Sequence, residues 1–142
     1  MHLRSAAIFA SKSTQMKTTV HTDKAPAAIG PYSQAIAVNG FLYTSGQIAL
    51  NPESGELEMQ NIEHETGRVM QNLQAVLEAV EMDFSNVIKT TIYLSDMAYY
   101  AQVNAVYAEF FGEHPPAREA VQVAGLPKGV NVEISCVAYK QP

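Results

Sequence analysis

Two charged side chains occur in segments of this sequence that otherwise have the pattern of β-strands. Arg118 lies near the start of the run 117–124, and Glu133 lies in the middle of the run 131–139. A guanidinium in a fixed position suits a planar carboxylate, because it can donate two parallel hydrogen bonds to it. A glutamate can supply or remove a proton through a water. The chemistry that these residue types allow is the binding of a small carboxylate with acid–base catalysis.

The alternative is that Arg118 forms an ion pair with an acidic residue of its own chain. Pro115 and Pro116 precede it and form a rigid entry to the strand. If the two runs form a simple hairpin, residue 118 lies opposite residue 137, and Glu133 lies about 13 Å along the strand from that point. The two charges converge only if the strands are not neighbours, or if one charge comes from a second subunit. The spacing therefore favours a site over an internal ion pair.

Other signatures of catalysis are missing from the sequence. It contains no Gly-rich phosphate loop and no GxSxG motif. The four histidines lack ligand spacing, and Cys136 is the single cysteine, so we expect no metal site, no cofactor and no internal disulfide. The net charge of -5 and the absence of a basic cluster argue against nucleic-acid binding. No apolar run approaches the ~20 residues of a membrane span.

The segments around the two charges predict a mixture of strands and helices. Residues 33–50 form two β-like runs around Asn39 and Gly40, a pair that favours a type I′ hairpin turn. Residues 86–96 are rich in β-branched side chains and predict a further strand. With the two helices described next, the order is hairpin, helix, strand, helix, strand and strand. This order favours one mixed sheet with both helices on one face.

Two helices are predicted from hydrophobic periodicity. Asn61 caps the first, which runs to about Met82 with apolar residues at three- and four-residue steps. Glu63 and Glu65 lie in its first turn, where the helix dipole favours negative charge. The second helix spans about 98–111. On one side it carries Tyr100, Val103, Tyr107, Phe110 and Phe111.

Residues 1–16 differ in composition from the rest of the chain. They are basic and rich in serine, and the first acidic residue is Asp23, as in a short transit peptide. A natural start at Met16 and a tail are the alternatives. We expect residues 1–16 to be an extension and residues 17–142 to form a single domain. We expect a cytoplasmic location, or a mitochondrial one if the extension is a transit peptide.

Several longer segments carry a resemblance to a known family. Between about Thr18 and Tyr139 the chain contains, in this order, APAAIGPYSQAI, YTSGQIALNPESGE, IKTTIYLSDM, VNAVYAEFF and PPAREAVQVAGLPKGVNVEIS. In sequence and spacing these segments resemble the RidA (YjgF) family of reactive-intermediate (enamine/imine) deaminases. The resemblance implies an α+β fold, with a single six-stranded mixed β-sheet and two helices packed on one face. It also implies a chorismate-mutase-like homotrimer with ligand sites in the clefts between subunits.

The resemblance implies an activity as well. Members of the family hydrolyse 2-aminoacrylate, 2-iminobutanoate, 2-iminopropanoate and related 2-imino acids, which pyridoxal-phosphate enzymes release, to 2-keto acids and ammonia. Arg118 stands at the carboxylate-binding arginine and Glu133 at the acid that holds or activates water, so both are expected to be catalytic. The expected substrate-binding residues are Tyr32, Ser45, Gly46, Asn104, Arg118 and Ala120. The implied partner is a small-molecule substrate without a cofactor. A non-catalytic small-molecule binder or regulatory trimer on the same fold is the alternative.

Two residues depart from the family pattern. Residue 120 is often cysteine in the family and is Ala120 here, so thiol chemistry is not essential, although its backbone N–H can still hold substrate. Glu119 stands where a small residue is usual. Alternation points its side chain away from Arg118. A bend in the strand would instead let Glu119 compete for the guanidinium.

Overall fold

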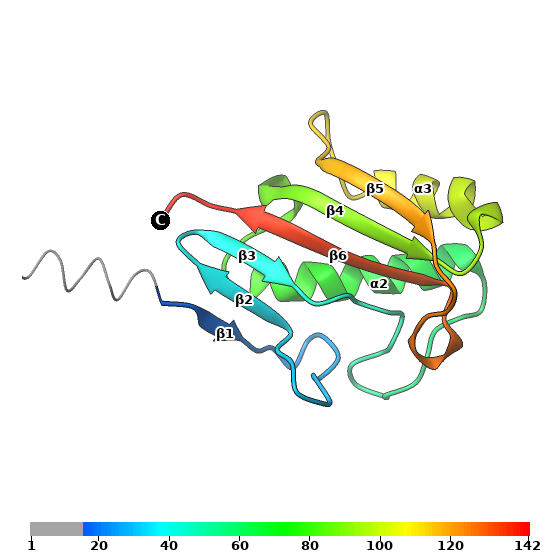
Figure 1. Ribbon diagram of the computed structural model, residues 1–142, viewed down its shortest axis with the longest axis horizontal. Helices are drawn as coiled ribbons and strands as arrows, with labels where there is room; N and C mark the ends of the chain where they lie inside the picture. The colour runs from blue at the N-terminus through cyan, green and yellow to red at the C-terminus, as the bar shows by residue number, and fades with distance from the viewer. Residues whose placement is uncertain (1–15) are drawn as a thin grey trace, which may run out of the picture.

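The computed structural model describes residues 16–142, so the expected extension lies outside the described residues except for Met16. The strands are β1 (Thr18–Val20), β2 (Ala35–Val38), β3 (Phe41–Thr44), β4 (Val87–Leu94), β5 (Ala117–Gln122) and β6 (Val132–Tyr139). The helices are α2 (Ile62–Glu78) and α3 (Tyr100–Ala108). All six strands form one sheet in the order β1-β2-β3-β6-β4-β5, with both helices on one face (Figure 1). Only the β4–β5 pairing is parallel within residues 16–142, so the predicted mixed sheet is confirmed.

The predicted turn at Asn39–Gly40 and the predicted helix cap at Asn61 are both present in the structure. Asn39 and Gly40 have φ values of 50° and 84°, and they connect β2 to β3 in a tight turn. A Cβ at residue 40 would lie 2.5 Å from the backbone oxygen of Lys140, so this turn requires glycine for space as well as for φ. The side chain of Asn61 accepts a hydrogen bond of 2.7 Å from the backbone N–H of His64, which confirms the cap of α2.

Two helices have boundaries that differ from the predictions, and one strand was not predicted. The helix α2 ends at Glu78 rather than near Met82, because the chain turns away at Glu81, which has a φ of 59°. The helix α3 is shorter than 98–111 and follows a single turn of 3₁₀ helix. The strand β1 was not predicted, since three residues are too few to show alternation.

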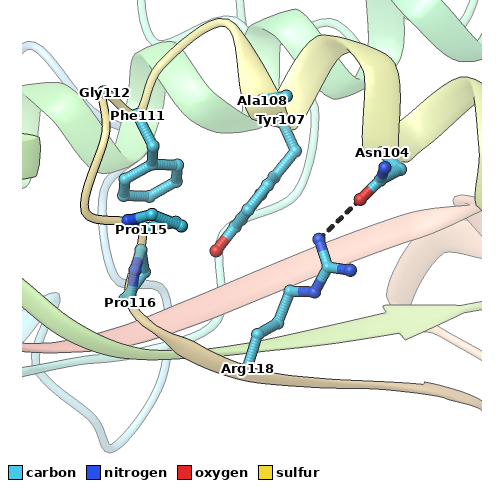
Figure 2. Close-up of a pocket in the computed structure, with 8 residues that line it drawn as sticks. All are labelled: Asn104, Tyr107, Ala108, Phe111, Gly112, Pro115, Pro116 and Arg118. Carbon is cyan, nitrogen blue, oxygen red and sulfur yellow. Dashed lines mark hydrogen bonds between the residues drawn. The ribbon is translucent and has the colours of Figure 1, made fainter.

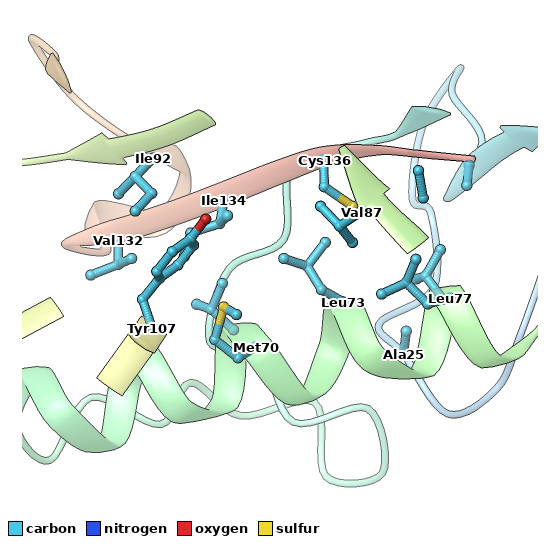
Figure 3. Close-up of a cluster of buried hydrophobic side chains, with 14 of the residues drawn as sticks. Ala25, Met70, Leu73, Leu77, Val87, Ile92, Tyr107, Val132, Ile134 and Cys136 are labelled. Carbon is cyan, nitrogen blue, oxygen red and sulfur yellow. The ribbon is translucent and has the colours of Figure 1, made fainter. Parts of the chain in front are cut away.

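The core lies between the sheet and the two helices (Figure 3). Met70 and Leu73 of α2 and Tyr107 of α3 are buried against Ile92 of β4 and Ile134 of β6. No helix of the described residues lies over the opposite face of the sheet, and Tyr43 and Val121 are exposed there. Within residues 16–142, no helix combines the length and apolar character needed to cross a membrane.

The hairpin considered for residues 117–124 and 131–139 does not form. The strand β5 pairs in parallel with β4, while β6 lies between β3 and β4. A helix, α3, connects β4 to β5, and a crossover of this kind brings its two strands together in parallel. The last strand then enters the centre of the sheet, as suits its alternating buried residues.

This strand order places the two predicted catalytic residues on different faces of the sheet. Thr90 of β4 is in register with Arg118 on one side and Cys136 on the other, and it is buried on the helix face. Tyr93, three residues along the same strand, is in register with Glu133. Because neighbouring residues in register share a face, Arg118 lies on the helix face and Glu133 lies on the open face.

A candidate active site in two halves

The first half of the candidate site surrounds the guanidinium of Arg118. The side chain rises from β5 toward α3 (Figure 2). Its Nη1 atom donates a hydrogen bond of 2.7 Å to Oδ1 of Asn104, and its Nη2 atom donates one of 2.7 Å to the hydroxyl oxygen of Tyr100. The Cζ atom lies 4.9 Å from the centre of the Tyr107 ring, within range of a cation–π contact. Two regular elements therefore fix the position of this cation.

Its partners distinguish Arg118 from Arg68, the other arginine of the described residues, which pairs with Glu58. The salt bridges found in residues 16–142 do not include Arg118, and its partners are an amide, a hydroxyl and aromatic faces, all of them neutral. Glu119 points to the opposite face, as alternation predicts, and pairs with Lys89 at 3.2 Å. A partly buried cation that pairs with no carboxylate in the described part of the chain is suited to bind an anion.

A cavity of about 430 Å³ lies beside this guanidinium. Asn104, Tyr107, Phe111 and Arg118 are among the residues that line it (Figure 2). The Tyr107 hydroxyl forms a hydrogen bond of 2.7 Å with Thr90. Burial raises the pKa of Tyr107, although the bond to Thr90 and the charge of Arg118 act in the opposite direction. The phenol therefore stays neutral at physiological pH and does not compete with an anion.

The second half of the candidate site contains Glu133. A hollow of about 480 Å³ is lined by four of the predicted site residues, namely Tyr32, Ser45, Gly46 and Glu133. Burial raises the pKa of the Glu133 carboxyl, which is partly buried, and no opposing contribution lowers it. A carboxyl of raised pKa exchanges protons near neutral pH more readily than an ordinary glutamate does, which suits acid–base catalysis.

Two neighbours restrict the Glu133 side chain and the surface around it. A Cβ at residue 46 would overlap the Glu133 carboxylate, so the position of that carboxylate requires glycine there. The Ser45 hydroxyl donates a hydrogen bond of 2.6 Å to the backbone oxygen of Ser33, and its backbone N–H donates one of 2.9 Å to Gln34. The Ser45 side chain can therefore offer a ligand only the lone pairs of its hydroxyl oxygen while its bond to Ser33 is intact.

A buried carboxylate ties the start of β6 to α2. Glu65 is 1% exposed and accepts hydrogen bonds from the backbone N–H groups of Asn131, at 2.7 Å, and Val132, at 3.0 Å. The side-chain amide of Asn131 donates a third, at 3.1 Å. These bonds hold the chain one residue before Glu133. Sequence reasoning placed Glu65 in the first turn for its charge and missed this contact.

Two buried amides hold two other segments near Glu133, one of which includes Ile48 and Leu50 and the other Pro26. Asn72 donates hydrogen bonds to the backbone oxygens of Ile48 and Leu50, at 2.9 and 3.0 Å. Gln34 is 2% exposed and bonds the backbone at Thr22, Ala25 and Pro26. One signal for Asn72 was present in the sequence: it lies seven residues after Glu65, so both polar residues share a helix face.

The structure thus separates the predicted site residues into two groups. Tyr32, Ser45, Gly46 and Glu133 line one hollow, and Asn104 and Arg118 line the other. Ala120 lies on the Arg118 face of β5, packs against the core and lines neither of these two. Within residues 16–142, no cluster of three His, Cys, Asp or Glu side chains could hold a metal ion. A single chain therefore holds the predicted cation and the predicted acid in separate places.

Comparison with known proteins gives matches over nearly the whole described chain. The sequence model of a family described as "Endoribonuclease L-PSP" matches residues 22–140. A Mus musculus protein named 2-iminobutanoate/2-iminopropanoate deaminase is 45% identical over 130 residues, covering 92% of this chain and 96% of its own. Reactive Intermediate Deaminase A, chloroplastic, from Arabidopsis thaliana is 44% identical over 133 residues, covering 94% and 71%. The structure of the Rid family protein YyfA from Yersinia pestis has a TM-score of 0.86 at 45% identity, covering 88% and 100%.

Proposed function

The chain belongs to the RidA (YjgF) family, and from this premise we propose that it hydrolyses 2-imino acids such as 2-iminobutanoate and 2-iminopropanoate to 2-keto acids and ammonia. The observation that carries the proposal is the Arg118 guanidinium, partly buried and held by neutral groups alone among residues 16–142. Such a cation is suited to grip the carboxylate that every 2-imino acid carries.

The proposed reaction adds water across the carbon–nitrogen double bond. Arg118 binds the substrate carboxylate, which orients the electrophilic carbon, and charge-assisted hydrogen bonds of this kind contribute on the order of 1.5–3 kcal/mol. Glu133 takes a proton from the attacking water and delivers it to the substrate nitrogen. Glu133 then moves the hydroxyl proton of the tetrahedral intermediate to its amino group, which leaves as ammonia while the carbon–oxygen double bond of the 2-keto acid forms. Carbon, nitrogen and oxygen keep their oxidation states, so the reaction requires no redox cofactor.

We propose that the two halves meet between subunits of a homotrimer. Arg118 and Glu133 lie on opposite faces of the sheet, so neither a side-chain rotation nor a small loop movement joins them within one chain. The strand β5, which carries Arg118, is at the edge of the sheet. The open face, with Tyr43 and Val121 exposed, offers apolar surface for a second copy. In this arrangement each cleft takes the cation from one subunit and the acid from the next.

RNA is a less suitable ligand than a small carboxylate, although the matching family description names a ribonuclease. The net charge of -5 opposes the approach of a polyphosphate. The proposed anion site offers one guanidinium, which matches one carboxylate. We place the activity in residues 17–142, which include the whole range of the family match.

A coupled assay tests the activity. A dehydratase generates the imine, and purified protein should accelerate the release of 2-ketobutyrate. We expect Arg118→Ala to abolish the acceleration, while the control Arg68→Ala, whose arginine pairs with Glu58 at 3.0 Å outside the site, retains it. Equal acceleration by wild type and Arg118→Ala would refute the proposed role of Arg118, whereas no acceleration by either protein would favour the non-catalytic binder.

Subunit mixing tests the shared site. Arg118→Ala and Glu133→Gln subunits, each inactive alone, are co-expressed in equal amounts. If the two residues of one site come from different subunits, random assembly of a cyclic trimer pairs two intact residues in about a quarter of the sites. We therefore expect about a quarter of the wild-type activity in the mixture. A mixture as inactive as its components would show that each site belongs to one chain.

A further inference from the structure

Tyr100 makes a contact with Arg118 that its place in the sequence did not predict. It is the first residue of α3, and Asn104 follows one helical turn later. Its hydroxyl oxygen accepts a hydrogen bond of 2.7 Å from Nη2 of Arg118, while Asn104 accepts one from Nη1. The residue is 37% exposed, so this tyrosine is not held in place by burial in the core. The two acceptors lie on one helix face and hold the two ends of the guanidinium.

We infer that Tyr100 is a positioning residue, whose hydroxyl fixes the plane of the Arg118 guanidinium and thereby sets the affinity for the substrate carboxylate. The inference rests on the proposed function, because it assumes that Arg118 binds that carboxylate. Tyr100 is not among the expected site residues, because the sequence pattern placed it only on the apolar side of a helix.

The flexibility of the Arg118 side chain is the reason that a second acceptor matters. An arginine side chain has several rotatable bonds and loses about 2 kcal/mol of rotamer entropy when it is fixed. With only the hydrogen bond from Nη1 to Asn104, the plane of the guanidinium could still rotate about that hydrogen bond. A second acceptor at Nη2 removes this freedom before the ligand arrives, so the ligand does not bear the cost of ordering the side chain.

The neutrality of the two acceptors also matters. An aspartate or glutamate in the place of Tyr100 would orient the guanidinium equally well, but it would offset the charge that the substrate carboxylate requires. A phenol and an amide orient the cation and leave its charge available. The guanidinium has more N–H groups than these two acceptors use, so the remaining donors can bind a carboxylate.

The substitution Tyr100→Phe isolates the hydroxyl. The Cζ atom of Arg118 lies 5.6 Å from the centre of the Tyr100 ring, and a phenylalanine ring preserves that contact. Tyr99→Phe is the matched control, because it removes the neighbouring hydroxyl while the two acceptors of Arg118 stay intact.

The first experiment needs no ligand and does not depend on the proposed function. In an NMR spectrum of the arginine side chains, hindered rotation gives separate Nη signals for Arg118, which the loss of signals in Arg118→Lys identifies. We expect these signals to merge in Tyr100→Phe and to stay separate in Tyr99→Phe. Unchanged Nη signals in Tyr100→Phe would overturn the inference.

The second experiment measures the binding of 2-ketobutyrate by calorimetry. We expect Tyr100→Phe to bind it about tenfold more weakly, as for the loss of one hydrogen bond to a charged group, and Tyr99→Phe to bind it as wild type does. Wild-type affinity in Tyr100→Phe would overturn the inference, as would weaker binding with unchanged Nη signals, which would indicate a direct ligand contact. Failure of the proposed function would show separately, as imine hydrolysis that the wild-type protein does not accelerate.

Discussion

Arg118 is held by two regular elements, whereas Glu133 stands on β6 but faces a hollow formed mainly by loops. The guanidinium stands on β5, and its acceptors Tyr100 and Asn104 are one turn apart on α3, so the geometry of the helix and the sheet sets their spacing. The hollow at Glu133 is lined mainly by segments without regular structure, including residues 26–32 and 45–50. No repeating geometry fixes those segments relative to one another.

Buried polar side chains replace that geometry in the Glu133 half. Gln34, Asn72 and Glu65 each hold one segment by hydrogen bonds to its backbone. Because these bonds are inside the protein, they are stronger than at the surface and costly to leave unmade. Single substitutions around Arg118 should therefore have smaller effects than substitutions around Glu133, and a substitution in one half should leave the other half intact.

The largest effect is expected from removing the acid. Glu133→Gln keeps the shape of the side chain and removes its ability to exchange a proton, so we expect kcat for imine hydrolysis to fall by about 10²–10⁴-fold. Binding of 2-ketobutyrate should change little, since Arg118 is intact. The control is Glu119→Gln, on the open face and paired with Lys89. A kcat near the wild-type value would remove Glu133 from the mechanism.

Glu133→Gln should also change how the free energy of unfolding depends on pH. Burial raises the pKa of Glu133 above its ordinary value of 4.5, so the folded protein binds this proton more tightly than the unfolded chain does. The free energy of unfolding therefore falls as the pH rises from 4.5 through the raised pKa, and this decline should be absent in Glu133→Gln. Urea denaturation of both proteins across this pH range measures it. Parallel curves would show that folding does not perturb the group.

The next largest effect is expected from Gly46→Ala. The added methyl group overlaps the Glu133 carboxylate and must displace it, and a displacement of about 1 Å can cost on the order of 10²-fold in rate. We expect kcat/KM to fall by about that factor while the affinity for 2-ketobutyrate, measured by calorimetry, falls much less. Gly67→Ala is the control, since a Cβ at residue 67 meets open space. An active Gly46→Ala would place the working carboxylate elsewhere.

Local signals in the sequence were sufficient for the elements but not for their arrangement. The Asn39–Gly40 turn and the Asn61 cap depend on a few adjacent residues, and both were predicted correctly. The position of β6 between β3 and β4 depends on contacts between residues far apart in the chain, which no local pattern encodes. For this reason the sequence left open whether the last two strands are neighbours, and the structure shows that they are not.

The same distinction applies to the candidate site. Arg118 and Glu133 could be proposed because charged residues are conspicuous in strand patterns. Glu65 and Tyr100 were missed because each fitted a simpler reading, as a charge favoured by the helix dipole and as part of an apolar helix side. A charged residue between Ile62 and Val69 on the apolar stripe was the available clue to Glu65, because a charge on that face must find partners when the helix packs.

An intermediate effect is expected from Glu65→Gln. The neutral amide cannot accept from all three N–H groups at Asn131 and Val132, and its own NH₂ group opposes one of them. We expect the free energy of unfolding to fall by about 2 kcal/mol, with kcat reduced because the chain before Glu133 is released. Glu63→Gln, on the exposed surface of the same helix, is the control. Equal stability of the two variants in urea would mean that β6 does not depend on this anchor.

The smallest effect is expected in the Arg118 half, from Tyr107→Phe. This change removes the hydroxyl that bonds Thr90 and keeps the ring 4.9 Å from the guanidinium, so the position of Arg118 should not alter. We expect a loss of about 1 kcal/mol in the free energy of unfolding and an unchanged affinity for 2-ketobutyrate. Urea denaturation at one protein concentration and calorimetry measure the two quantities, because assembly makes stability depend on concentration. If affinity fell together with stability, the regular elements alone would not be holding the cation, and the contrast between the two halves would weaken.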